Sequence, residues 1–243
     1  MSYPYFFVNS SSSIEGNKIK IEGEDLNHLI NVLRSKAGDT VYISDNADYK
    51  YKTEIIDIKK SDVILLIKNK RKIAKKIPQV TLYQCILKKN SMEFVIQKST
   101  EIGVDRIIPV ISGRVIIDKR KIAGKVDRWQ KISNGASEQS RRDFKCEILS
   151  PEDINSIKVS DYDLFYVPYE EGSGNGGGLA EVRNVSRIGY IIGPEGGFET
   201  GELNFLKDNG AREIRFGKNI YRSETAAIYF LSVLDYLTGN QNV

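Results

Sequence analysis

The chain has 243 residues, of which 40% are hydrophobic and 28% charged, a composition typical of one large or two small globular domains. No apolar run approaches the ~18 residues of a membrane span, and the N-terminus lacks the basic start and apolar core of a signal peptide. We therefore expect a cytoplasmic protein with no membrane partner. With one His, and with Cys85 and Cys146 isolated in apolar segments, we expect no metal site and no disulfide.

The net charge of +4 is unevenly distributed along the chain. Residues 77–151 carry 14 Lys and Arg against 8 Asp and Glu, whereas residues 152–243 carry 8 against 14. Six more basic residues lie between Lys68 and Lys76. A basic face of this kind attracts phosphate backbones, although a solvated Lys-rich surface explains the Lys68–Lys76 run equally well.

Residues 1–70 have the pattern of a small β-rich domain. Strand-like alternation recurs in several short segments separated by turn sequences. One helix is expected from about Asp25 to Arg34, with Leu26, Leu29 and Leu33 on one face. The pattern predicts a small β-barrel, followed by a basic linker at residues 71–78 that ends at Pro78.

From residue 79 to residue 243, strand-like and helix-like segments alternate. Apolar strands are expected at Leu82–Leu87, Arg106–Ile111 and Tyr162–Val167, and a mostly helical segment at Lys119–Ser140. Such alternation is typical of an α/β domain whose mostly parallel sheet is covered by helices on both sides.

Two glycine-containing turns near the C-terminus carry most of the functional information. One is Ile192-Gly193-Pro194-Glu195-Gly196-Gly197-Phe198, and the other runs from Phe216-Gly217 to Arg222-Ser223-Glu224-Thr225-Ala226-Ala227. Each follows a predicted strand and precedes a predicted helix, which Thr200 and Ser223 respectively are expected to cap. In open α/β sheets, small ligands bind at this end of the strands. Ordinary strand-to-helix turns also contain glycine, but the dinucleotide fingerprint and the P-loop are both absent.

This pair of turns resembles the S-adenosylmethionine-binding loops of SPOUT-type RNA methyltransferases, in particular the enzymes that methylate N3 of a uridine in bacterial 16S small-subunit ribosomal RNA. Other segments match in order: His28–Arg34, Glu93 with Gln97–Val104, and Trp129 with Glu138–Arg141. The chain departs from the family pattern at Tyr5, Gly135, Asn219 and Tyr221. The resemblance implies a trefoil-knotted methyltransferase domain at residues 79–243, preceded by a PUA-like RNA-binding β-barrel at residues 1–70. It also implies a homodimer that acts on ribosomal RNA, which we expect to lie in an assembled small subunit.

The resemblance and the local chemistry together select candidate residues. We expect S-adenosylmethionine to bind Gly193, Pro194, Glu195, Gly196, Gly197, Phe216, Gly217, Ile220, Tyr221, Thr225 and Ala226. The candidate catalytic residues are Arg222, Glu138 and Arg141, and the candidate RNA-binding residues are His28, Arg34, Lys70, Arg71, Lys72 and Arg142. Arg222 is expected to stabilise charge on the uracil or to hold a phosphate, since uridine N3 must lose its proton before it can attack.

Four simpler or competing interpretations stay open from the sequence. Arg222 could form a surface ion pair, and His28 on its helix could be a packed or capping residue. The chain could also be an RNA-binding factor with a degenerate cofactor site, which would not bind S-adenosylmethionine. A SPOUT enzyme that modifies another RNA is a further alternative, although the matching N-terminal segment argues against transfer RNA.

Overall fold

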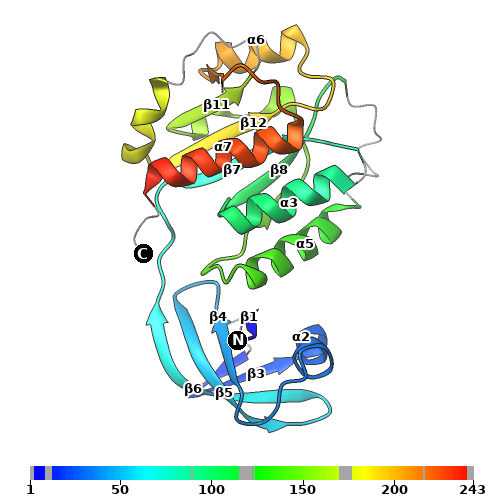
Figure 1. The fold of residues 1–243 in the computed structure, drawn as a ribbon, viewed down its shortest axis with the longest axis vertical. Coiled ribbons are helices and arrows are strands. Elements are labelled where there is room, and N and C mark those ends of the chain that lie inside the picture. Colours follow the sequence, from blue (N-terminus) through cyan, green and yellow to red (C-terminus); the bar gives the residue numbers. More distant parts are fainter. Residues whose placement is uncertain are drawn as a thin grey trace. The chain divides into compact units, whose positions relative to one another are not determined.

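The computed structural model describes residues 3–8, 13–88, 90–114, 122, 124–169, 177–215 and 217–239. These residues form two compact units (Figure 1). The first unit is Met1–Lys75 together with Glu138–Lys145, and the second is Lys76–Ser137 together with Cys146–Val243. The predicted division into residues 1–70, 71–78 and 79–243 stays a prediction, to which the structure adds that Glu138–Lys145 packs within the first unit.

The first unit is built on a six-stranded sheet with the strand order β1-β4-β5-β6-β3-β2. All neighbouring strands are antiparallel except β1 and β4. The elements are β1 (Tyr5–Phe7), β2 (Ile14–Glu15), β3 (Lys18–Glu22), α2 (Gly23–Asn27), the π-helical turn η1 (His28–Val32), β4 (Thr40–Ser44), β5 (Tyr49–Ile58) and β6 (Asp62–Lys72). Alternate residues of these strands point inward, and Phe6, Leu29, Ile43 and Leu65 lie at the centre of the core.

Two local predictions for this unit need correction. The helix expected at Asp25–Arg34 is instead α2 followed by η1, and Arg34 has a positive φ of 56° just beyond it. The basic linker expected at residues 71–78 begins inside a strand, because β6 continues to Lys72. Arg71 pairs with Lys50 of β5 across the ladder, and its side chain binds Asp143.

The segment Glu138–Lys145 is fastened to the sheet of the first unit by polar contacts. Asp143 accepts hydrogen bonds from Lys50 Nζ and Arg71 Nη2, each at 3.0 Å. The hydroxyls of Tyr5 and Ser44 donate to the carbonyls of Arg142 (2.6 Å) and Asp143 (2.7 Å). Tyr5, one of the departures from the family pattern, thus has a structural partner, and burial raises the pKa of its phenol above the ordinary value.

The second unit contains a seven-stranded sheet in which every pair of neighbouring strands is parallel, as predicted. The strand order is β10-β8-β7-β12-β11-β13, with β9 also paired to β8. The strands are β7 (Gln79–Cys85), β8 (Arg106–Ile111), β9 (Glu147–Ile148), β10 (Glu152–Asp153), β11 (Leu164–Pro168), β12 (Arg187–Ile192) and β13 (Arg212–Ile214). The helices are α3 (Asn90–Ile102), α5 (Val126–Gln139), α6 (Thr200–Asp208) and α7 (Ser223–Thr238), with 3-10 turns η2 (Ile154–Ser156), η3 (Val159–Asp161) and η4 (Gly177–Asn184).

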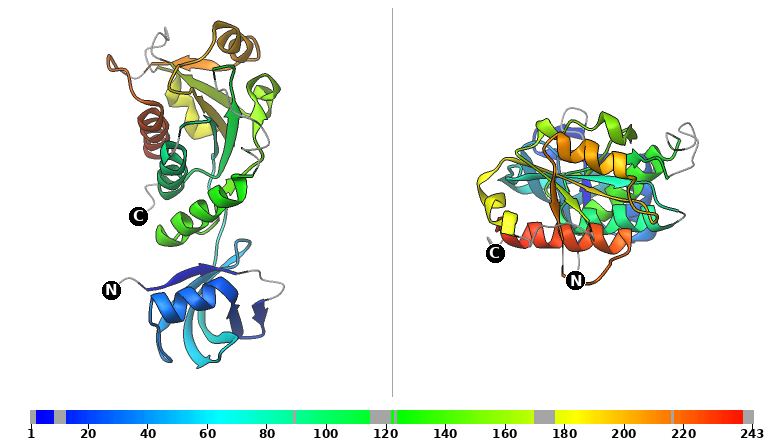
Figure 2. Two further views of the ribbon diagram at one scale, coloured as in Figure 1. Left: turned by 90° about the vertical axis from the view of Figure 1, so that its right-hand side faces the viewer. Right: turned by 90° about the horizontal axis from the view of Figure 1, so that it is seen from above.

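Helical segments cover both faces of this parallel sheet (Figures 1 and 2). The core on one face joins α3, α5, α7 and η4 to strand residues such as Leu82 and Tyr190. The core on the other face joins α6, η2 and η3 to Tyr83 and Ile191. The α/β class and the parallel sheet are therefore confirmed. The trefoil knot, with residues near 190–225 threaded through a loop, stays a prediction.

The helical segment expected at Lys119–Ser140 is described as α5, which begins only at Val126. Most of the expected first turns lie outside the described residues.

None of the described helices is long and apolar enough to cross a membrane. The part of the chain that the structure describes also contains no group of three or more His, Cys, Asp or Glu side chains placed to bind a metal.

We predict that Asp143→Ala destabilises the first unit by about 1–3 kcal/mol, because hydrogen bonds to a charged group are worth about that much when partly buried. The side chains of Lys50 and Asp143 are only 17% and 31% exposed, so water screens their pairing weakly. Urea unfolding, with the midpoint compared between variant and wild type, measures the change.

The matched control is Asp57→Ala, which removes an ion pair with Lys59 whose side chains are 51% and 57% exposed. Such exposed pairs contribute little, so this variant should unfold like the wild type. Equal midpoints for Asp143→Ala and Asp57→Ala would contradict the anchoring role of Asp143.

Candidate active site

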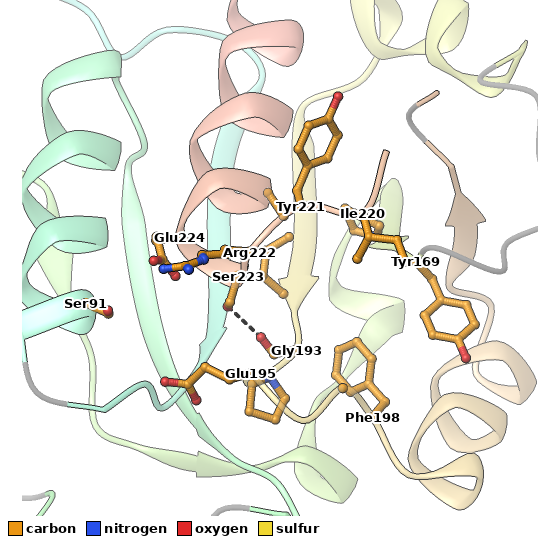
Figure 3. A pocket seen from close by; sticks show the side chains of 15 residues that line it. Ser91, Tyr169, Gly193, Glu195, Phe198, Ile220, Tyr221, Arg222, Ser223 and Glu224 are labelled. Atoms are coloured by element: carbon orange, nitrogen blue, oxygen red, sulfur yellow. Dashed lines mark hydrogen bonds between the residues drawn. The ribbon is translucent and has the colours of Figure 1, made fainter. Parts of the chain in front are cut away.

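A cavity of about 470 Å³ opens in the second unit, where β11 and β12 end (Figure 3). These two strands are parallel neighbours, so the loops that follow them leave the same edge of the sheet. Both glycine-containing turns singled out in the sequence contribute to its wall. The cavity is lined by Ser91, Pro168, Tyr169, Ile192, Gly193, Pro194, Glu195, Gly197, Phe198, Ile220, Tyr221, Arg222, Ser223, Glu224 and Ala226.

Glycine suits the first loop at two positions for different reasons. Gly197 has a φ of +70°, which side chains other than glycine rarely adopt, and its N–H donates to the Pro194 carbonyl at 2.9 Å. At Gly193, a Cβ atom would lie 3.1 Å from the ring of Phe198. The turn is therefore tight and brings main-chain groups to the cavity wall.

A chain of hydrogen bonds ties this loop to the second one. The Ser223 hydroxyl donates to the Gly193 carbonyl at 2.6 Å and accepts from Gln84 Nε2 at 3.0 Å. Gln84 is completely buried on β7, and its Nε2 also donates to the Cys85 carbonyl. Ser223 was predicted to be a helix cap, which is wrong, because the cap position belongs to Arg222 and Ser223 is the first residue of α7.

Contacts with residues outside the two loops hold the first loop in place. Glu195 Oε1 accepts from the Lys88 N–H at 3.1 Å, and Arg114 donates to the Gly196 carbonyl. Glu199, not Thr200 as predicted, caps α6 in a reciprocal capping box with Glu202. Glu202 Oε1 also accepts from the Gly113 N–H, which connects α6 to the end of β8.

Most of the predicted cofactor-binding residues meet at this one cavity. Gly193, Pro194, Glu195, Gly197, Ile220, Tyr221 and Ala226 line it. Gly196, Gly217 and Thr225 do not line it, and Phe216 lies outside the described residues. Ile220 is 78% exposed, and the ring of Tyr221, another departure from the family pattern, stacks on Tyr229 at 5.3 Å.

Several lining residues were not predicted to bind the cofactor. Tyr169 follows β11, so its place beside β12 depends on the strand order and not on any motif. Ser91 is the second residue of α3, and Phe198 ends the glycine-rich turn. Ser223 and Glu224 stood next to predicted residues, but the sequence indicated only a helix start there.

The three candidate catalytic residues do not belong to one unit. Arg222 lines the cavity with an exposed side chain. Glu138 and Arg141 belong to the first unit, and neither lines the cavity. Burial, with a smaller contribution from the carboxylate of Asp25, raises the pKa of Glu138 to about 7, while Lys145 acts in the opposite direction.

The candidate RNA-binding residues all lie in the first unit. Lys70, Arg71 and Lys72 occupy the end of β6, where Lys70 Nζ lies 4.7 Å from the ring centre of Tyr49. The ring of His28 meets that of Phe6 edge-on, with the ring centres 5.7 Å apart, and His28 is otherwise exposed, so both its packing role and its RNA-binding role stay predictions. Arg142 Nε donates to the Phe144 carbonyl, and Arg34 is exposed.

The structure has a parallel sheet with a cavity at its strand ends and a separate N-terminal sheet. Comparison with known proteins identifies this arrangement as that of an RNA methyltransferase. Residues 75–235 match the RNA methyltransferase domain, and residues 21–68 match the RNA methyltransferase PUA domain.

Curated relatives narrow this class. Ribosomal RNA small subunit methyltransferase E of Mesomycoplasma hyopneumoniae is 31% identical over 93% of this chain and 96% of its own length. The protein of the same name in Bacillus subtilis is 28% identical over 96% of each chain. The chain belongs to the family of these ribosomal RNA small subunit methyltransferases E.

Solved structures agree with this assignment. A methyltransferase of Legionella pneumophila in complex with its cofactor S-adenosylmethionine is 28% identical, with a TM-score of 0.84 over 97% of this chain and 98% of that one. A ribosomal RNA small subunit methyltransferase E of Neisseria gonorrhoeae, at 24% identity and a TM-score of 0.85 over 97% and 98% of the two chains, supports the fold.

The first prediction for this site concerns Ser223→Ala. Removing the hydroxyl leaves the Gly193 carbonyl and one Gln84 donor without a partner, so the two loops should lose their fixed spacing. We expect the affinity for S-adenosylmethionine, measured by calorimetry, to fall about tenfold, which corresponds to about 1.4 kcal/mol.

Ser232→Ala is the control for this variant, since Ser232 is an exposed serine of the same helix whose hydroxyl donates to the Ile228 carbonyl. It should bind the cofactor like the wild type. Unchanged affinity in Ser223→Ala would mean that the hydrogen bond does not set the geometry of the cavity.

The second prediction follows from the raised pKa of Glu138. The folded protein holds this proton up to about pH 7, whereas the unfolded chain releases it near the ordinary value of about 4.3. The contribution of this carboxyl to stability is therefore full below about pH 4 and is lost as the pH rises to about 7. Glu138→Gln should unfold about 2–4 °C above the wild type at pH 8, after allowance for partial exposure, and the difference should shrink toward pH 5.

Thermal unfolding followed by circular dichroism at both pH values measures this difference. The exposed Glu15→Gln is the control and should shift the melting temperature at neither pH. If the melting temperature of Glu138→Gln differed from that of the wild type by the same amount at pH 5 and pH 8, the raised pKa of Glu138 would be refuted.

Proposed function

We propose that this protein transfers a methyl group from S-adenosylmethionine to N3 of one uridine in the 16S ribosomal RNA of the small subunit. The observation that carries the proposal is the single cavity that joins the two predicted cofactor loops and Arg222 at the carboxyl ends of parallel strands. Relatives of the same family are named for the small-subunit ribosomal RNA, and related structures contain S-adenosylmethionine.

The residues of the cavity suit the proposed cofactor. A volume of about 470 Å³ falls within the range of about 300–1,000 Å³ found for small-molecule and cofactor sites. Glycine positions expose main-chain donors and acceptors for an adenine and an amino acid, and Ile192, Phe198 and Ile220 provide apolar wall. When bound, the cofactor supplies an activated methyl group on a sulfonium centre.

The protein must then orient the uracil and stabilise its deprotonated form. Arg222 lies at the start of α7, inside the lining of the cavity, and carries a fixed positive charge. A guanidinium there favours the anion that develops when N3 loses its proton. Glu138 and Arg141 stay candidate catalytic residues on the strength of the family resemblance.

The test of this proposal combines Arg222→Ala with mapping of the product. Wild-type protein added to small-subunit ribosomal RNA or to small subunits lacking the modification should yield one N3-methyluridine by mass spectrometry. Arg222→Ala should lower kcat by about 10²-fold or more while the Kd for RNA changes little, since its role belongs to the transition state.

Lys218→Ala serves as the matched control, because Lys218 is an exposed cation of the same loop that does not line the cavity. Product without N3-methyluridine would refute the proposed target atom, and normal turnover of Arg222→Ala would refute the proposed role of Arg222.

We further propose that the protein acts in the cytoplasm as a homodimer on the assembled small subunit. Tyr229 and Tyr236 are 42% and 67% exposed and lie two turns apart on α7, an aromatic surface typical of interfaces. A mass equal to one chain in light scattering would contradict the homodimer. Equal methylation of free ribosomal RNA and of small subunits would contradict the preference for the particle.

A further inference from the structure

One face of the sheet in the first unit carries an aromatic and basic groove. Tyr42 on β4, Lys52 on β5 and Asn69 on β6 stand opposite one another across three strands. Ser44, Lys50 and Arg71 form the next such row, two residues along each strand. Residues two apart on a strand share a face, and the alternate residues Ile43 and Tyr51 belong to the core, so both rows lie on the face away from that core. On this face Ser44 is fully buried and its hydroxyl donates to the Asp143 carbonyl, so the open part of the face is the row of Tyr42, Lys52 and Asn69.

The rows border a cavity of about 290 Å³ lined by Tyr42, Lys50, Tyr51, Lys52, Asn69, Lys70 and Arg71. The ring of Tyr42 is half-buried and contacts the ring of Tyr3. The two ring centres are 5.8 Å apart, and the ring planes are inclined by 59°. Tyr3 is 49% exposed. The groove therefore has an aromatic wall that is held in place on one side and open to solvent on the other.

The charged residues that line this cavity are all basic. The lining residues, all within the described part of the chain, include no Asp or Glu. Asp143 binds Lys50 and Arg71 together, so one carboxylate is shared by two cations. Lys52 adds a further cation with an exposed side chain. An anionic ligand would find an excess of positive charge at this end of the groove.

We propose that this groove binds one unpaired nucleotide of the substrate RNA. The base stacks on Tyr42, the phosphate lies near Lys52 and Arg71, and the Asn69 amide is free to bond to the edge of the base. Aromatic rings beside basic side chains on an open sheet suit single-stranded RNA, whose bases are available for stacking, better than a duplex, whose bases are not. The inference rests on the proposed function only in taking the natural ligand to be ribosomal RNA.

The groove also gives a more specific role to basic residues that the sequence predicted to bind RNA. Lys70 and Arg71 were expected to bind RNA as part of a general basic run. In the structure both contribute to the lining of this cavity, but Lys70 stands opposite the core residue Tyr51, so only Arg71 belongs to the two outer rows. The lining also includes aromatic and amide groups that a phosphate backbone alone does not need. The sheet face thus combines attraction for phosphate with a surface for a single base.

The test is binding of a short fluorescent oligouridylate and of an RNA duplex to the full-length protein, measured by fluorescence anisotropy at one salt concentration. Tyr42→Leu, which keeps bulk but removes the flat ring, should weaken oligouridylate binding about tenfold and leave duplex binding nearly unchanged. Tyr42→Phe should retain wild-type affinity for both probes. Lys52→Gln should weaken binding of both, because it removes attraction for phosphate.

Lys60→Gln, a change of an exposed lysine in the turn between β5 and β6, is the control for Lys52→Gln and should have little effect. Calorimetry with S-adenosylmethionine checks that every variant is folded in the second unit, and thermal unfolding checks the first. Wild-type oligouridylate affinity in Tyr42→Leu, or an equal loss for the duplex, would overturn the proposal.

The binding test of the groove and the product test of the proposed function can fail independently of each other. A protein that makes N3-methyluridine but binds oligouridylate independently of Tyr42 would refute the nucleotide groove alone. A protein whose product lacks N3-methyluridine, yet whose oligouridylate binding depends on Tyr42, would refute the target atom and leave the groove in place.

Discussion

The hydrogen bond from the Ser223 hydroxyl to the Gly193 carbonyl is the contact on which the proposed active site depends. It joins the loop after β12 to the first residue of α7, two segments about 30 residues apart in the chain. Gln84 on the central strand β7 donates to the same hydroxyl. The two loops are therefore bonded to the middle of the sheet as well as to each other. A buried network of this kind holds a site in one geometry, which cofactor binding requires.

The same principle of anchoring by polar contacts operates in the first unit. Asp143 is a short side chain of the segment Glu138–Lys145, and it binds Lys50 of β5 and Arg71 of β6 together. The tyrosine and serine hydroxyls of neighbouring strands complete the attachment through main-chain carbonyls. This arrangement leaves Lys52 and the ring of Tyr42 beside the anchored cations, which is why a nucleotide groove can form there.

The two units divide the chemistry between them. The second unit supplies a cavity with main-chain groups, apolar wall and the guanidinium of Arg222, which suits a reaction in which the cofactor is already activated. The first unit supplies positive charge and aromatic rings, which suit recognition of the RNA. The contrast between the basic residues 77–151 and the acidic residues 152–243 does not follow this division, since chain segments from both charge classes build the second unit.

The sequence by itself determined the alternation of strands and helices, the two glycine turns and the family, because periodicity, turn chemistry and motif spacing are local properties of the chain. Tertiary structure decided which loops meet. Tyr169 and Ser91 reach the cavity only because β11 lies beside β12 and α3 opens near it, and Ser223 became a link between loops because the buried Gln84 lies within hydrogen-bonding distance. It also placed Glu138 with the sheet of the first unit and extended β6 through the expected linker, since long-range partners such as Asp143, rather than local propensity, stabilise those positions.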